Sequence, residues 1–117
     1  MSYDRSLLCA RIFEALDKNP SSSLQELAGL LRVSRRTIQN AVIAVTGMKF
    51  KDLREEILLA RFQHTLMSEP AAAIKELSRE LGYRSARSFA RAIRRLCGAS
   101  PEQLRAIIAR ELVGSKA

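Results

Sequence analysis

The sequence predicts an all-α fold that contains the same helix-turn-helix motif twice. Three observations predict this fold. Apolar residues recur at helical spacing through most of the chain, helix start and stop signals bound these stretches, and one stretch repeats another about 50 residues later. At 117 residues the chain is long enough for one domain, or for two very small ones that depend on each other for stability.

The first predicted helix supports the amino-terminal half of the chain. It spans residues 5–18 and ends before Asn19-Pro20, a pair that interrupts helices. We expect its buried stripe to comprise Leu7, Leu8, Ile12, Phe13 and Leu16.

A helix-turn-helix motif follows this helix. Ser23 and Glu26 have the spacing of a capping box and predict the start of a second helix. Its buried side is expected to comprise Leu24, Leu27, Leu30 and Leu31. After the short turn at residues 32–34, a third helix runs to Gly47, and its buried stripe is expected to comprise Ile38, Val42 and Val45.

The outer face of the third helix carries side chains suited to the edges of DNA bases. On a helical wheel, Arg36 and Asn40 lie opposite the apolar stripe, with Gln39 beside them. Arginine donates two hydrogen bonds to guanine, and asparagine or glutamine pairs twice with adenine. This face is therefore a candidate site for base contacts.

The same motif recurs in the second half of the chain. Residues 24–28 match residues 74–78 at an offset of 50, and the offset becomes 51 after the second turn, which is one residue longer. Ser34 then aligns with Ser85, and Gly47 aligns with Gly98. Two copies are too few for a stacked repeat array, so a module with two binding surfaces is the simpler interpretation.

The segment between the two motifs is predicted to be one long helix. Residues 50–68 contain no Gly or Pro and would form a helix about 27 Å long. This length is close to the roughly 34 Å between successive major-groove faces of DNA. Its apolar residues lie on several sides, which favours burial against both motifs; a dimer interface is the alternative. We expect subdomains over 1–49 and 70–117, joined by a linking helix over 50–69.

The most distinctive stretch runs from Arg84 to Pro101. Ser85 and Gly98 are plausible start and stop signals for a helix. Its apolar arc comprises Phe89, Ile93 and Leu96, with Ala86 at the edge, and the opposite arc comprises Arg87, Arg91 and Arg94. No acidic residue occurs from Arg84 to Ser100. A solvated charged face usually mixes both signs, so this face favours binding of a polyanion, most commonly DNA.

A last helix follows, with a capping serine and a proline at its first position, Ser100-Pro101. We expect its inner stripe to comprise Leu104, Ile107, Ile108 and Leu112.

Composition restricts the class of protein further. The net charge of +8 suits a polyanionic partner, although charge alone does not separate DNA from RNA, acidic proteins or anionic membranes. Cys9 and Cys97 have no zinc-site or disulfide spacing and are interpreted as small buried side chains. No catalytic arrangement, metal site, cofactor motif, export signal or membrane span is apparent. We expect a cytoplasmic protein that is not an enzyme, carries no cofactor and does not contact membranes.

The chain resembles the DNA-binding domain of the AraC/XylS family of bacterial transcription regulators. The resemblance covers about Ser22 to Arg105, and its most specific part comprises Gly82-Tyr83, Ser88-Phe89, Arg91, Arg94-Arg95, Gly98, Ser100-Pro101 and Leu104-Arg105. It implies seven helices, two helix-turn-helix subdomains joined by a long central helix, and binding as a monomer to two adjacent major-groove segments. It also implies base contacts from Arg36, Gln39, Asn40, Arg87 and Arg91.

Around these positions we expect phosphate contacts from Arg35, Arg84, Ser85, Arg94 and Arg95. The chain departs from the family pattern in its first motif, where Ile43 and Ala44 replace residues that are often basic and Asn40 stands where Arg is frequent. We therefore expect the second motif to dominate affinity. Ile43 is interpreted as a tolerated surface residue, a contact to a thymine methyl group or a contact to a protein.

Two functions remain open. The favoured hypothesis is a sequence-specific regulator that binds double-stranded DNA with two recognition helices and is a monomer in the absence of DNA. The alternative is a helix-turn-helix interaction module that docks a partner from the transcription machinery, such as RNA polymerase. Binding of single-stranded RNA is a weaker third hypothesis, because the aromatic residues do not alternate with exposed basic ones.

Overall fold

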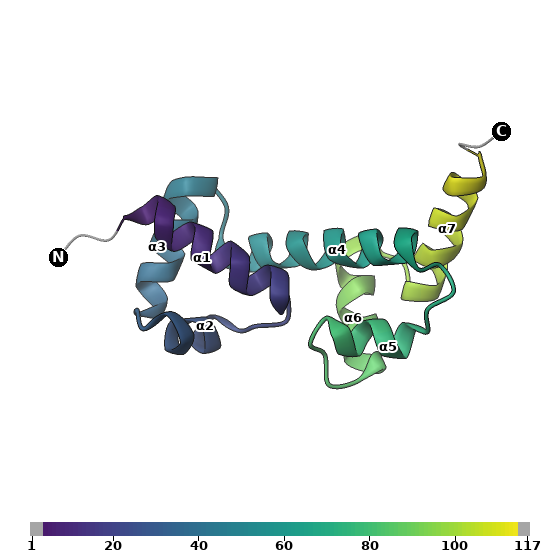
Figure 1. Ribbon diagram of the computed structural model, residues 1–117, viewed down its shortest axis with the longest axis horizontal. Helices are drawn as coiled ribbons and strands as arrows, with labels where there is room; N and C mark the ends of the chain where they lie inside the picture. Colours follow the sequence, from purple (N-terminus) through teal and green to yellow (C-terminus); the bar gives the residue numbers. More distant parts are fainter. Residues whose placement is uncertain (1–3, 115–117) are drawn as a thin grey trace. The chain divides into compact units, whose positions relative to one another are not determined.

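The computed structural model describes residues 4–114, with side chains through Glu111 (Figure 1). Within this range the chain contains seven helices and no strand. The helices are α1 (Arg5–Lys18), α2 (Leu24–Leu31), α3 (Arg35–Thr46), α4 (Phe50–Ser68), α5 (Ile74–Glu80), α6 (Ala86–Cys97) and α7 (Pro101–Gly114). The predicted all-α fold with seven helices is confirmed.

The chain divides into two compact units, and the division falls inside α4, between Ile57 and Leu58. The first unit contains the motif formed by α2 and α3, and the second contains the motif formed by α5 and α6 (Figure 1). Phe50 and Leu53 at the start of α4 are buried in the first core, whereas Phe62 further along is buried in the second. A single helix therefore contributes to both cores, as its apolar residues on several sides predicted.

The two cores correspond to each other at eight of nine buried positions, all but Phe50 in the first core and Leu81 in the second. The first comprises Leu8, Ile12, Leu16, Leu27, Ile38, Ala41, Val42, Phe50 and Leu53. The second comprises Leu58, Phe62, Leu66, Leu77, Leu81, Phe89, Ala92, Ile93 and Leu104. The repeat is more extensive than the sequence comparison indicated, because Leu58, Phe62 and Leu66 follow the α1 stripe at the same offset of 50 as α2 and α5. The second half of α4 thus supports α5 and α6 as α1 supports α2 and α3.

The turns inside the two motifs share one backbone conformation. Each contains a residue with left-handed backbone, Arg32 (φ 57°) in the first and Gly82 (φ 92°) in the second. The next residue in each turn, Val33 or Tyr83, donates its N–H to the carbonyl five residues earlier, at 3.2 and 3.0 Å. The additional residue of the second turn is therefore Arg84, which adds a positive charge next to Ser85, the N-cap of α6.

A partly buried arginine stabilises the start of each motif in the same way. Arg54 of α4 donates to the carbonyl oxygen of Ser22 at 3.3 Å, and Arg105 of α7 donates to the carbonyl oxygen of Ala72. Both acceptors lie just before the first helix of the motif. Each contact ties that loop to the helix that closes the unit, and so fixes where the motif begins.

The predicted capping box is present at the start of α2, and α7 begins with the same arrangement. The N–H of Glu26 donates to Ser23 Oγ at 3.0 Å, and the N–H of Ser23 donates to Glu26 Oε1 at 3.4 Å. At α7 the corresponding distances between Ser100 and Gln103 are 3.1 and 2.8 Å. These contacts satisfy N–H groups that have no partner within the helix.

Several apolar side chains that were expected in buried stripes are exposed, so those predictions were wrong. They are Leu7 (54%), Phe13 (39%), Leu30 (68%), Val45 (48%) and Ile107 (46%). In units this small each helix buries one narrow stripe, and side chains at its edge or beyond the end of the core remain in solvent. Val45 lies on the stripe of α3 but in its last turn. Leu112 lies outside the described side chains.

The two cysteines differ in environment. Cys9 on α1 is buried as expected, and burial raises the pKa of its thiol. Cys97 is exposed, contrary to expectation, because it lies in the last turn of α6, past the second core. Its Sγ donates to the carbonyl oxygen of Ile93 at 3.3 Å.

Candidate nucleic-acid interface

The first candidate surface is the outer face of α3. Ser34 caps this helix by accepting the N–H of Thr37 at 3.0 Å, and Gly47 ends it with a left-handed φ of 75°. Ile38 and Val42 are fully buried. Because these two side chains fix the rotation of the helix about its axis, the opposite face is turned to solvent.

The predicted side chains of this face are exposed. Arg36, Gln39 and Asn40 all lie in solvent, as does Arg35 in the first turn. None of the four side chains has a hydrogen-bond or ion-pair partner among residues 4–114. Their polar groups are therefore available to a ligand.

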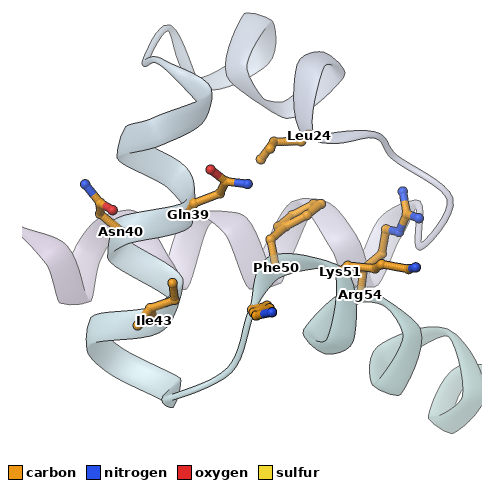
Figure 2. Close-up of a pocket in the computed structure, with 8 residues that line it drawn as sticks. Leu24, Gln39, Asn40, Ile43, Phe50, Lys51 and Arg54 are labelled. Atoms are coloured by element: carbon orange, nitrogen blue, oxygen red, sulfur yellow. The ribbon is translucent and has the colours of Figure 1, made fainter.

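An open groove of about 530 Å³ lies beside α3 (Figure 2). Its lining residues are Leu24, Gln39, Asn40, Ile43, Lys49, Phe50, Lys51 and Arg54. Three of these eight are cationic and none is acidic. Figure 2 shows Gln39 and Ile43 on α3 facing the region where Phe50 begins α4.

The groove adds Lys49 and Lys51 to the candidate site, although neither residue was predicted to contact DNA. The available signal was two lysines on either side of Phe50, directly after the Gly47 stop. Their relevance depends on how the chain turns after Gly47, because this turn brings the start of α4 to the edge of the α3 face.

The second candidate surface is the outer face of α6. Ser85 caps the helix by accepting the N–H of Ser88 at 3.1 Å, and Gly98 ends it with a φ of 74°. Phe89 is fully buried and packs edge-on against the ring of Phe62, with the ring centres 4.9 Å apart. It also contacts the ring of Tyr83, at 5.3 Å between centres. These ring contacts fix the orientation of the helix.

Arginines fill the outer face of α6. Arg87, Arg91 and Arg94 line a shallow depression of about 300 Å³ together with Ala90, and no acidic residue contributes to it. The guanidinium groups of these three arginines have no partner in the described part of the chain. Arg94 was predicted to contact phosphate, yet it shares this depression with both arginines that were predicted to contact bases.

The remaining predicted residues of the second motif, Arg84, Ser85 and Arg95, are also exposed. Arg84 lies in the turn before α6. Ser85 is exposed and also caps this helix. The structure therefore places every residue predicted to contact DNA on the surface. Four lie in the first unit, Arg35, Arg36, Gln39 and Asn40, and six lie in the second, Arg84, Ser85, Arg87, Arg91, Arg94 and Arg95.

The two faces are equivalent in position but differ in chemistry. At the offset of 51, Arg36 corresponds to Arg87, whereas the next positions differ. Gln39 corresponds to Ala90, Asn40 to Arg91, Ile43 to Arg94 and Ala44 to Arg95. The first face therefore presents amides and one apolar side chain where the second presents mainly guanidinium groups.

Other kinds of site find little support in the described residues. No group of three or more His, Cys, Asp or Glu side chains in residues 4–114 is placed to hold a metal ion. In the same range, no helix combines the length and the apolar character that crossing a bilayer requires.

Comparison with known proteins identifies the family of the chain. A family model described as "Helix-turn-helix domain" matches residues 27–107. No curated protein matches the chain. Among solved structures, the C-terminal domain of AraT, a response regulator from Geobacillus stearothermophilus, is similar in fold. That chain is 22% identical, with a TM-score of 0.74, and the match covers 90% of this chain and 88% of that one. Because the family model matches most of the chain, the protein belongs to the AraC-type helix-turn-helix family of DNA-binding transcription regulators.

Proposed function

We propose that this protein binds specific double-stranded DNA sequences by placing α3 and α6 in two adjacent segments of the major groove. The observation that carries the proposal is the pair of equivalent helix faces, both exposed and both lined without acidic residues. A helix fits the major groove, and exposed donors on its outer face contact base edges there.

The exposed side chains divide into two roles. Base contacts come from Arg36, Gln39, Asn40, Arg87 and Arg91. Phosphate contacts come from Arg35, Arg84, Ser85, Arg94 and Arg95, and the groove beside α3 adds Lys49 and Lys51. Phosphate contacts position a protein on the duplex, and base contacts supply its specificity.

The length of α4 supports a monomer that spans both segments. Its 19 residues correspond to a helix of about 28 Å, close to the roughly 34 Å that separates successive major-groove faces. We propose that residues 50–69 act as the spacer between subdomains over 1–49 and 70–117, so that one chain binds two segments without dimerising.

A pair of substitutions tests the division into base and phosphate contacts. Arg91→Ala is expected to weaken binding to the preferred duplex by about 1 to 3 kcal/mol and to relax one base position. Arg84→Ala serves as the matched control, because it removes an exposed arginine from the same motif and should weaken binding to all duplexes alike. Fluorescence anisotropy with preferred and random duplexes measures both effects. Equal losses for both variants on both duplexes would remove Arg91 from the base contacts.

A second candidate function is docking of a protein from the transcription machinery, such as RNA polymerase. The exposed Leu7 and Phe13 of α1 and Leu30 of α2 favour it, because covering large apolar side chains with a partner removes them from water. Under this function, DNA contacts would be secondary.

Salt dependence separates the two functions. The proposed phosphate contacts include six cations, namely Arg35, Lys49, Lys51, Arg84, Arg94 and Arg95. Each neutralised phosphate contributes about −0.9 to the slope of log affinity against log salt, so a slope of about −5 is expected. Affinity for duplex DNA should then fall about 10³-fold between 50 and 200 mM salt. A chain that leaves duplex DNA unbound at low salt but binds polymerase would support the second function instead.

A further inference from the structure

Ile43 is an apolar side chain in the middle of a polar recognition face. It is 50% exposed. On the helical wheel it lies between Gln39 and Asn40, which are about 100° apart. A face of this kind loses its water when it enters the major groove, and an apolar side chain there needs an apolar partner. The apolar group that DNA presents in the major groove is the C5-methyl of thymine.

The surroundings of Ile43 fit that partner. Ile43 lines the same groove as the amides of Gln39 and Asn40, which suit adenine, and as the ring of Phe50, which provides apolar lining (Figure 2). Lys49 and Lys51 contribute positive charge to this groove, and no acidic side chain lines it. This charge complements a phosphate backbone rather than a neutral apolar surface.

The second unit offers a contrast at the equivalent position. There Arg94 replaces Ile43, and Arg91 replaces Asn40. Arginine favours guanine, through its O6 and N7 acceptors. Asn40 and Arg91 are therefore suited to opposite base pairs, and Ile43 stands where the second face has Arg94, a proposed phosphate contact.

We propose that Ile43 is a specificity-determining residue that contacts a thymine methyl group, so that α3 selects an A·T pair at the position that Ile43 contacts. This inference rests on the proposed function. It assigns to Ile43 a role in sequence selection, which does not follow from exposure alone.

Replacing thymine by deoxyuridine tests the contact directly, since this change removes the methyl group and leaves every hydrogen-bonding group in place. The preferred duplex is first obtained by selection from a random pool with the full chain. Each thymine is then replaced singly by deoxyuridine, and dissociation constants are measured for the wild type, Ile43→Ala and Val45→Ala. Val45 is the matched control, because it is an apolar residue of α3 with 48% exposure on the other side of the helix.

The wild type is expected to lose about fourfold in affinity at one deoxyuridine position, as for the loss of one buried methyl group. Ile43→Ala should remove that loss, and Val45→Ala should retain it. Ile43→Arg should abolish the preference for A·T at the same position in a second selection, because the apolar partner of the thymine methyl group is lost. Circular dichroism confirms that each variant is folded, as expected for exposed positions.

Two outcomes overturn the inference, and they are distinguishable. A pool that yields no preferred sequence overturns the proposed function together with this inference. A preferred sequence that wild type and Ile43→Ala bind with the same deoxyuridine losses overturns this inference alone.

Discussion

Phe89 offers the most direct test of how the second core orients the arginines of α6. Its side chain is fully buried, between the rings of Phe62 and Tyr83. Phe89→Ala is expected to destabilise the protein by about 3 to 5 kcal/mol, through lost burial and the cavity left behind. A chain of 117 residues has a total stability of roughly 6 to 18 kcal/mol, so this loss is a large fraction.

Phe89→Leu separates the ring contacts from burial as such. Leucine keeps most of the apolar volume but loses two aromatic pairs, each worth about 0.5 to 1.5 kcal/mol. We expect a loss of about 1 to 3 kcal/mol, smaller than for alanine, and retained DNA binding, because Arg87 and Arg91 lie on the opposite face of α6.

Urea unfolding followed by circular dichroism measures both variants, and anisotropy with duplex DNA measures function. The reasoning is refuted if Phe89→Ala costs less than about 1 kcal/mol. It is also refuted if the leucine variant keeps full stability but loses DNA binding, since Phe89 would then act at the interface rather than in the core.

Two further predictions concern single residues. Gly98→Ala is expected to lower the free energy of unfolding by about 1 to 2 kcal/mol, because φ is 74° at this position. The cost comes from the backbone alone, since no atom lies within 4 Å of the added Cβ. Gly47→Ala should cost the same, and an unchanged urea midpoint in either variant would contradict the strain argument. Cys97 should react with a thiol reagent in the folded protein, whereas Cys9, buried and with a raised pKa, should react only after unfolding. Mass spectrometry counts the labels, and two labels on the native protein would show that Cys9 is accessible.

The helices were predictable from the sequence because their signals are local. Capping at Ser23 and Ser100, and the left-handed residues Gly47 and Gly98, each depend on a few neighbouring residues. The doubled motif was visible because identical residue types recur at a constant offset. These signals need no knowledge of the tertiary structure.

Burial at the edges of the stripes was not predictable, because it depends on how much core each unit can build. Leu30 satisfies the helical spacing as well as Leu27, yet it is 68% exposed while Leu27 is buried. The spacing specifies which side of a helix faces inward, but not how wide the covered strip is. That width depends on which helices of the same unit pack there.

The part of the candidate site that lies on a single helix was predictable from the sequence. The part that residues of two helices form together was not. The outward arginines of α6 follow from the wheel alone. The groove beside α3 does not, because Lys49 and Lys51 meet Gln39 through the turn after Gly47. Contacts between two helices depend on the geometry of the turn that connects them, and the pattern of residue types does not specify this geometry.

The sharing of α4 limits how the protein can be divided. A fragment that stops before Phe50 would lose two buried residues of its core, Phe50 and Leu53. A fragment that keeps all of α4 would instead expose the apolar side chains of Leu58, Phe62 and Leu66 to solvent, which favours self-association. Neither cut yields a clean half, so truncation is a poor way to assign affinity to one recognition helix, and point substitutions on intact protein are required.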